Sequence, residues 1–255
     1  MGISADYKPK IEVVSDTGFA DRCVDIFVSE AQKAIEMKEV FFVAISGGHT
    51  PASFFERLGQ SRTAIELPWK KIHLFWVDER YVPVDSKDSN FKLAADTFLG
   101  KVSVPQENVH PIPTEYDDIK EAADVYERTI RDTFNLQEGQ VPQFDLIVLG
   151  MGADGHTGSL FQSSYASLDT SDLVCVVYVM NHVLHEKLNR ITITYPVMQA
   201  AKHLLVLVSG EEKAEILKQI MTGEPDEIKY PIHLLWPVLY KVTWLIDEQA
   251  AKLLK

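Results

Sequence analysis

The chain has 255 residues, of which 46% are hydrophobic and 24% are charged. This composition is typical of a globular protein with a sizeable core, and it excludes wholesale disorder, collagen-like repeats and a disulfide-stapled miniprotein. Lysine and arginine number 25 against 37 aspartates and glutamates, which gives a net charge of −12. Because such a surface repels polyanions, we expect neither nucleic acid nor a membrane as a partner.

The two cysteines, Cys23 and Cys175, lie in unrelated segments without a CxxC partner. We therefore expect neither a disulfide framework nor a zinc knuckle. The N-terminus lacks the basic and apolar pattern of a signal peptide, and no apolar stretch approaches the ~20 residues that a membrane span needs. The sequence predicts a cytoplasmic protein with one domain over residues 1–255, present as a monomer or a weak homodimer.

Short β-branched or aromatic runs alternate along the chain with segments of helical spacing. Helices are predicted over 19–34, 51–58, 90–98, 119–134 and 211–221, and strands over 40–45, 72–77, 144–149, 173–179, 203–208 and 242–246. Several strands are nearly all apolar, a pattern typical of strands with both faces covered by helices. We expect a doubly wound, mostly parallel α/β sheet with helices on both faces, and a ligand site at the carboxyl ends of its strands.

A glycine-rich turn follows the first predicted strand, with the sequence Ser-Gly-Gly-His-Thr-Pro over 46–51. Gly47 and Gly48 let the backbone approach a ligand closely, while Ser46 and Thr50 offer hydroxyls. Pro51 suits the first turn of a helix, whose N–H groups attract an anion. The turn predicts a phosphate cradle, although an ordinary strand-to-helix turn has a similar composition.

Asp78, Glu79 and Arg80 follow the second strand, and Asn90 comes a short loop later. An arginine flanked by acids is commonly a solvated surface pair, and asparagine is a common helix N-cap. Their position after a strand's carboxyl end favours a place in the ligand site instead.

The segment 150–155 follows the third apolar strand and fits G-x-G-x-x-G, so a dinucleotide site is one interpretation. However, Asp154 and His156 lie in or beside this loop, where a dinucleotide-binding turn opens into an apolar helix. A carboxylate two residues from an imidazole can fix the tautomer or charge of the ring, as a general base near neutral pH requires. We expect His156 to be functional; a structural histidine is the alternative.

Two basic residues lie next to other predicted strands. Lys213 lies in the first turn of its predicted helix, where the helix dipole disfavours a cation, so its position suggests an anion to neutralise. An exposed helical lysine is the alternative. Arg190 directly precedes the short run that starts at Ile191. Together, the strand ends predict a pocket for a small phosphorylated molecule with one acid–base residue.

The segments SGGHTP, VDER, GMGADGHTGSLF, RITITYPV and SGEEK, in this order and spacing, resemble the 6-phosphogluconolactonase family. That family shares a fold with glucosamine-6-phosphate deaminase and ribose-5-phosphate isomerase, and the resemblance covers most of the chain. It implies a Rossmann-like fold of the sugar-phosphate isomerase/CoA-transferase type. It also implies hydrolysis of 6-phospho-D-glucono-1,5-lactone to 6-phosphogluconate in the oxidative pentose phosphate pathway, without a metal or organic cofactor.

The resemblance also implies roles for individual residues. His156 resembles the general base that activates water against the lactone carbonyl, with Asp154 as its orienting partner. Arg80 resembles the arginine that meets the hydroxyl or oxyanion end of the substrate. The expected substrate-binding residues are Asp78 and Asn90 and, for the 6-phosphate, Ser46, Gly47, Gly48, Thr50, Arg190 and Lys213.

Three positions depart from the family pattern. His49 replaces a serine in the first loop, Gln162 replaces a proline after the SLF run, and residues 182–189 replace a proline-rich connector ahead of Arg190. The first change brings a second imidazole near the expected phosphate. The third changes the expected local geometry around Arg190.

Three other functions fit parts of the sequence. A glucosamine-6-phosphate deaminase calls for a glutamate beyond the histidine, where this chain has Thr157 and Gly158. A nucleotide-binding protein without catalysis leaves His156 without a role. A zinc site can be started from His182 and His185, but no third ligand can be named.

The acidic pairs at 117–118 and 211–212 are interpreted as solvated helix caps or faces, and 230–240 as a structured loop.

Overall fold

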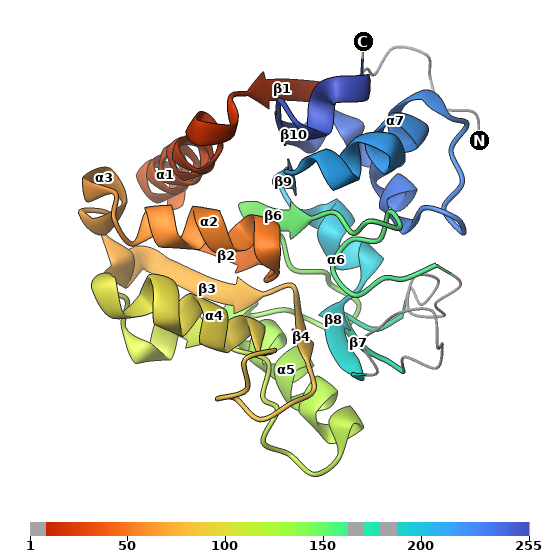
Figure 1. Cartoon of the computed structure of the whole chain (residues 1–255). Coiled ribbons are helices and arrows are strands. Elements are labelled where there is room, and N and C mark those ends of the chain that lie inside the picture. The colour runs from red at the N-terminus through yellow and green to blue at the C-terminus, as the bar shows by residue number, and fades with distance from the viewer. Residues whose placement is uncertain (1–8, 163–170, 179–187, 255) are drawn as a thin grey trace.

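The computed structural model describes residues 9–162, 171–178 and 188–254. Within these residues, seven strands form one sheet in which every neighbouring pair is parallel, as the sequence predicts for a doubly wound α/β fold (Figure 1). In spatial order the strands are β1 (Lys10–Val14), β10 (Val242–Asp247), β9 (His203–Val208), β6 (Leu146–Gly150), β2 (Phe41–Ile45), β3 (Ile72–Trp76) and β5 (Val109–His110).

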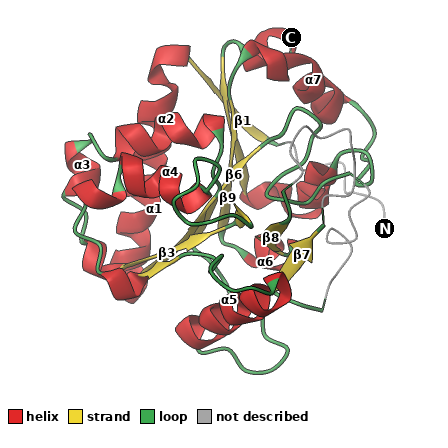
Figure 2. Cartoon of the chain, turned by 60° about the horizontal axis from the view of Figure 1, so that its bottom comes forward, coloured by secondary structure: helices red, strands yellow, loops and turns green. Residues whose placement is uncertain are grey.

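Helices cover both faces of this sheet, which lies between two helical layers in Figure 2. One layer holds α1 (Phe19–Lys38), α2 (His49–Leu58), α3 (Arg62–Ile65) and α4 (Asn90–Thr97). The opposite side carries α5 (Ile119–Phe134) and α6 (Tyr195–Ala200). A further helix, α7 (Ala214–Thr222), follows β9 and precedes β10. The double cover explains why the central strands are apolar at nearly every position.

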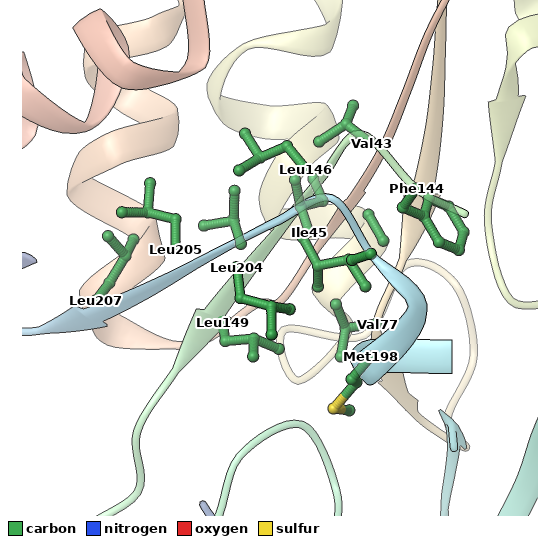
Figure 3. Packing of buried hydrophobic residues seen from close by; sticks show 14 of the residues in the cluster. Val43, Ile45, Val77, Phe144, Leu146, Leu149, Met198, Leu204, Leu205 and Leu207 are labelled. Atoms are coloured by element: carbon green, nitrogen blue, oxygen red, sulfur yellow. The ribbon is translucent and has the colours of Figure 1, made fainter. Parts of the chain in front are cut away.

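The core lies where these layers meet the sheet. Figure 3 shows buried side chains on neighbouring strands, such as Val43 and Leu146, which are register partners on β2 and β6 and are both fully buried. Burial of each such side chain contributes about 1.5–3 kcal/mol. The edge strand β1 differs, since Ile11 and Val13 are 40% and 50% exposed. The central strands therefore form a rigid support for the loops at their ends.

An aromatic cluster joins α1 and α2 to the sheet. The ring of Phe27 packs edge-on against Phe41 at 5.6 Å between centroids, and Phe54 lies 5.9 Å from Phe27. Phe41, Phe54 and Phe55 are fully buried, whereas Phe42 is only partly buried and packs against Phe134. This packing fixes α2, whose N-terminus follows the first glycine-rich turn.

A second, antiparallel sheet lies beside the main one. Its strands, in spatial order, are β4 (Asp78–Arg80), β8 (Arg190–Ile193) and β7 (Val174–Val177). The predicted strand at 173–179 belongs to this small sheet rather than to the parallel one. The chain reaches it because β4 continues beyond the end of β3, after Val77.

Most predicted elements lie within a few residues of the observed ones. The ends of β9 and α5 agree with the prediction, whereas α1 continues to Lys38. The predicted helix at 211–221 consists of a 3₁₀ turn, Glu211–Lys213, followed by α7. The predicted loop at 230–240 is largely 3₁₀ helix, Pro231–Lys241. In the described part of the chain, no helix combines the length and apolarity of a membrane span.

Candidate active site

A cleft opens at the carboxyl edge of the parallel sheet. The sheet order reverses between β2 and β6, and ligands of doubly wound sheets bind outside such a reversal. In Figure 1 the arrowheads of β3 and β6 point toward the same side of the molecule, where the small sheet lies. The cleft has a volume of about 760 Å³, and every residue predicted as catalytic or substrate-binding lines it.

The first wall of the cleft is the turn between β2 and α2. Gly48 has a φ of 104°, a conformation that favours glycine, and α2 begins directly after it without a side-chain cap. A Cβ on Gly47 would lie 2.0 Å from Oδ1 of Asn90, so only glycine fits there. The Ser46 hydroxyl is buried and has no hydrogen-bond partner among the described residues. Backbone N–H groups and a hydroxyl are therefore available to an anion.

The second wall is the loop after β6, which carries His156. Its shape is fixed by hydrogen bonds within the loop: Gly152 N–H donates to the carbonyl of His156 at 2.8 Å, and the Thr157 hydroxyl donates to the carbonyl of Gly150 at 2.9 Å. A Cβ on Gly152 would lie 2.1 Å from Nδ1 of His156. The imidazole thus packs directly on the backbone of its own loop.

Asp154 orients the imidazole. Nδ1 of His156 lies 2.5 Å from Oδ1 of Asp154, and the imidazole ring lies 4.6 Å from the Phe161 ring between centroids. Burial by itself raises the pKa of the Asp154 carboxyl, but the hydrogen bond and charge of His156 outweigh it and leave that pKa below its usual value. Asp154 is therefore ionised at neutral pH and favours the tautomer with the proton on Nδ1.

The third wall comes from β4 and the start of α4. Nη1 of Arg80 donates to Oδ1 of Asn90 at 2.6 Å and to the carbonyl of Asp88 at 3.2 Å. The acids beside Arg80 are buried, with Asp78 5% and Glu79 2% exposed, so the alternative of a solvated surface pair is wrong. Asn90 is not the N-cap either, because the hydroxyl of Ser89 caps α4.

Arg190 opens β8 and lies directly opposite Arg80 in the antiparallel register. It is 7% exposed, its Nη1 is 3.9 Å from Oδ2 of Asp78, and its guanidinium lies 5.4 Å from the centre of the Phe161 ring. Like charges opposite each other on paired strands are unfavourable unless anions balance them. Asp78 supplies one negative charge, and an anionic ligand in the cleft would supply more.

Lys213 reaches the cleft from the loop after β9. Asp247, at the end of β10, holds this loop by accepting hydrogen bonds from the Ser209 hydroxyl at 2.5 Å and from Gly210 N–H at 3.0 Å. Burial lowers the pKa of the Lys213 ammonium, and the charges of Glu212 and Asp154 offset this only in part. A lysine that is partly desolvated in this way gains from a bound anion.

Some lining residues were not predicted. Glu212, interpreted from the sequence as a solvated acid, lines the cleft beside Lys213, and His49 and Gln162 line it at two of the positions that depart from the family pattern. Phe161 forms the wall between His156 and Arg190. The sequence feature that could have identified it as a lining residue is its place in the SLF run. Considering described residues only, no three metal-ligating side chains come together. The histidines at 182 and 185 lie outside the described residues.

The chain is similar to known proteins over most of its length. Residues 15–244 match the model of a family described as glucosamine-6-phosphate isomerases/6-phosphogluconolactonase. A 6-phosphogluconolactonase of Synechocystis sp. is 35% identical over 248 residues, which cover 97% of this chain and 99% of that protein.

Solved structures are similar as well. The crystal structure of 6-phosphogluconolactonase from Thermotoga maritima superimposes with a TM-score of 0.78 at 31% identity, covering 94% of this chain and 100% of that one. For the 6-phosphogluconolactonase from Trypanosoma brucei the TM-score is 0.86 at 25% identity, with 98% and 100% covered. The fold expected from the sequence is thereby confirmed.

Proposed function

Because this chain belongs to the family of glucosamine-6-phosphate isomerases and 6-phosphogluconolactonases, we propose that its cleft hydrolyses 6-phospho-D-glucono-1,5-lactone to 6-phosphogluconate. The chain is an enzyme, and its overall reaction, in the oxidative pentose phosphate pathway, is that of its named relatives. The observation that carries the assignment of roles is the His156–Asp154 pair, which shares one cleft with three cations, Arg80, Arg190 and Lys213.

His156 acts as the general base. Since Asp154 accepts the proton on Nδ1, the ring nitrogen Nε2 takes a proton from water as the water oxygen attacks the lactone carbonyl carbon. The bond from that carbon to the ring oxygen then breaks, and the imidazolium returns its proton to the departing alkoxide. A positioned base contributes about 10²–10⁴ in rate, and no covalent nucleophile is needed.

Arg80 stabilises the oxyanion that forms on the carbonyl oxygen. Its hydrogen bonds to Asn90 and Asp88 hold the guanidinium in place before substrate arrives, so no reorganisation is needed during the reaction. Asp78 and Asn90 complete this end of the cleft as substrate contacts.

The 6-phosphate binds between the 46–50 turn and the cations Arg190 and Lys213. Supporting this role are the unpartnered hydroxyl of Ser46, the N-terminus of α2 and the partial desolvation of Lys213. Gly47, Gly48 and Thr50 supply the rest of the cradle. Binding of the remote phosphate orients the lactone carbonyl toward His156.

A coupled assay on freshly generated lactone tests the proposal. We expect efficient turnover of 6-phosphogluconolactone and a much lower kcat/KM for the unphosphorylated gluconolactone, because the latter lacks the group that the cradle holds. Equal rates on both lactones would contradict the phosphate assignment. Steady ammonium release from glucosamine 6-phosphate, without lactone turnover, would assign the chain to the other activity of its family.

A further inference from the structure

Glu79 is a buried carboxylate behind the cleft. It lies between Asp78 and Arg80 on β4, is only 2% exposed, and is not among the described residues that line the cleft. Its carboxylate therefore has no access to substrate. Any influence on the reaction must pass through the groups that it holds.

Four donors surround this carboxylate. Oε1 accepts from Arg80 N–H at 2.8 Å and from Asn90 N–H at 2.7 Å. Oε2 accepts from Phe91 N–H at 2.8 Å and from the Ser89 hydroxyl at 3.1 Å. Burial raises the pKa of Glu79, and its three bonds from backbone N–H groups partly offset this. The side chain thus ties β4 to the first turn of α4.

Glu79 binds the backbone N–H groups of Arg80 and Asn90, and the side chains of these two residues also contact each other in the site. Asn90 accepts from Arg80 through Oδ1 at 2.6 Å and donates through Nδ2 to the carbonyl of Asp78 at 2.8 Å. Asn90 also packs against Gly47, where a Cβ would overlap its amide. A shift of the α4 N-terminus therefore moves both the Arg80 guanidinium and the floor of the 46–50 turn.

We propose that Glu79 is a positioning residue, whose buried carboxylate holds Arg80 and Asn90 in the arrangement that the reaction needs. The inference rests on the proposed lactonase function. Both oxygens of the side chain must be acceptors, because each faces at least one backbone N–H, which can only donate. A glutamine of the same shape turns its NH₂ group toward either the Phe91 and Ser89 pair or the Arg80 and Asn90 pair, and an amide N–H then faces a backbone N–H.

The test compares Glu79→Gln with Asp145→Asn. Asp145 is also a buried carboxylate, 3% exposed, but it accepts from Phe42 N–H at the amino-terminal start of β2, on the opposite edge of the sheet. Both variants should melt at a lower temperature. Only Glu79→Gln should lower kcat/KM, by on the order of 10- to 100-fold and mainly through kcat, since small displacements of catalytic groups have effects of this size.

A double-mutant cycle with Arg80→Ala separates positioning from general destabilisation. If Glu79 acts through Arg80, adding Glu79→Gln to Arg80→Ala should lower kcat/KM by less than about twofold. Equal effects in both backgrounds would overturn the proposal. Glu79→Asp keeps the charge and should retain more activity than Glu79→Gln. If Glu79→Gln does not fold, Glu79→Asp takes its place in the cycle.

A crystal structure of the Glu79→Gln protein gives a readout that does not depend on turnover. The hydrogen bond between Arg80 Nη1 and Asn90 Oδ1 should be broken, and its retention would refute the positioning role. Absence of lactone turnover by the unmodified protein would refute the proposed function instead. The two failures are therefore distinguishable.

Discussion

Gly155 separates Asp154 from His156, and its φ of 81° turns the loop so that carboxylate and imidazole meet. The pair is partly exposed: the His156 side chain is 27% exposed and that of Asp154 35% exposed. A general base must be reachable by water yet held in one orientation. The partial exposure of His156 allows the first, and its contact with Asp154 provides the second. The spacing of the two residues was visible in the sequence, but the contact with Phe161 was not.

Replacement of the proposed base should affect catalysis rather than binding. His156→Ala is expected to lower kcat by about 10²–10⁴-fold with little change in KM, because the imidazole acts on water and not on the remote phosphate. Steady-state kinetics with the coupled lactone assay measures both constants. Full activity of this variant would exclude His156 as the base.

The close approach of Gly152 to the imidazole gives a second prediction. Gly152→Ala places a methyl group where the His156 ring lies, so the ring must move and kcat should fall by at least about tenfold. Gly100→Ala is the matched control, because a Cβ there meets nothing within 4 Å and its φ is not positive. Unchanged kinetics in Gly152→Ala would show that the ring position is not critical.

Among elements, those with strong local signals were predictable. The residues of β9 form one apolar run that ends at Ser209-Gly210, and α5 begins at an Asp118 N-cap and ends at a left-handed Asn135. In contrast, β1 has the half-polar sequence KIEVV of an edge strand, and β4 and β8 contain the charged side chains of the cleft. Their strand structure depends on distant partners, which no local pattern reveals.

The edge of the sheet carries a titratable pair that the sequence did not indicate. His73 on β3 and His110 on β5 lie with Nδ1 and Nε2 3.1 Å apart, and the His110 ring stacks on Phe75 at 4.3 Å. Burial, with a smaller contribution from the charge of His73, lowers the pKa of His110 to about 4. Burial also lowers the pKa of His73.

This pair makes stability dependent on pH. Because both folded-state pKa values lie below the ordinary value of 6.5, the unfolded chain binds more protons in mild acid. The stabilisation is complete above about pH 6.5 and is lost as the pH falls toward 4, and solvent screening limits it to roughly 1 kcal/mol. Urea unfolding at pH 7 and pH 5 measures the loss of unfolding free energy between the two pH values, and this loss should be smaller in His110→Phe. An equal loss in the unmodified protein and in His110→Phe would contradict this prediction.

At the scale of the whole molecule, a protein with a net charge of −12 concentrates three of its cations in one cleft. The sheet reversal between β2 and β6 brings together loops that are about a hundred residues apart in the chain. The 46–50 turn, the 78–80 segment, the His156 loop and Lys213 could be predicted to share the cleft because each follows a strand of one parallel sheet. Arg190 could not be placed in this way, because it opens β8 of the small antiparallel sheet. The contribution of Glu212 could not, since it depends on how the 3₁₀ turn at Glu211–Lys213 rotates.

Ligand binding should stabilise the folded chain in a selective way. At a concentration of 100 times its Kd, 6-phosphogluconate should add about 2.7 kcal/mol and raise Tm by roughly 5–10 °C. Gluconate should have almost no effect, because it lacks the phosphate, and thermal scans compare the two directly. A rise in Tm with NAD but not with 6-phosphogluconate would favour a nucleotide-binding protein.

The loop that holds His156 is braced by hydrogen bonds among its own residues, one from Gly152 N–H to the carbonyl of His156 and one from the Thr157 hydroxyl to the carbonyl of Gly150. Its conformation is thus largely insulated from which apolar side chains fill the layers below. Substitutions of core residues during evolution should therefore leave the position of the imidazole unchanged. Mutational tolerance in this enzyme should therefore be high beneath the sheet's carboxyl edge and low along that short glycine-rich segment.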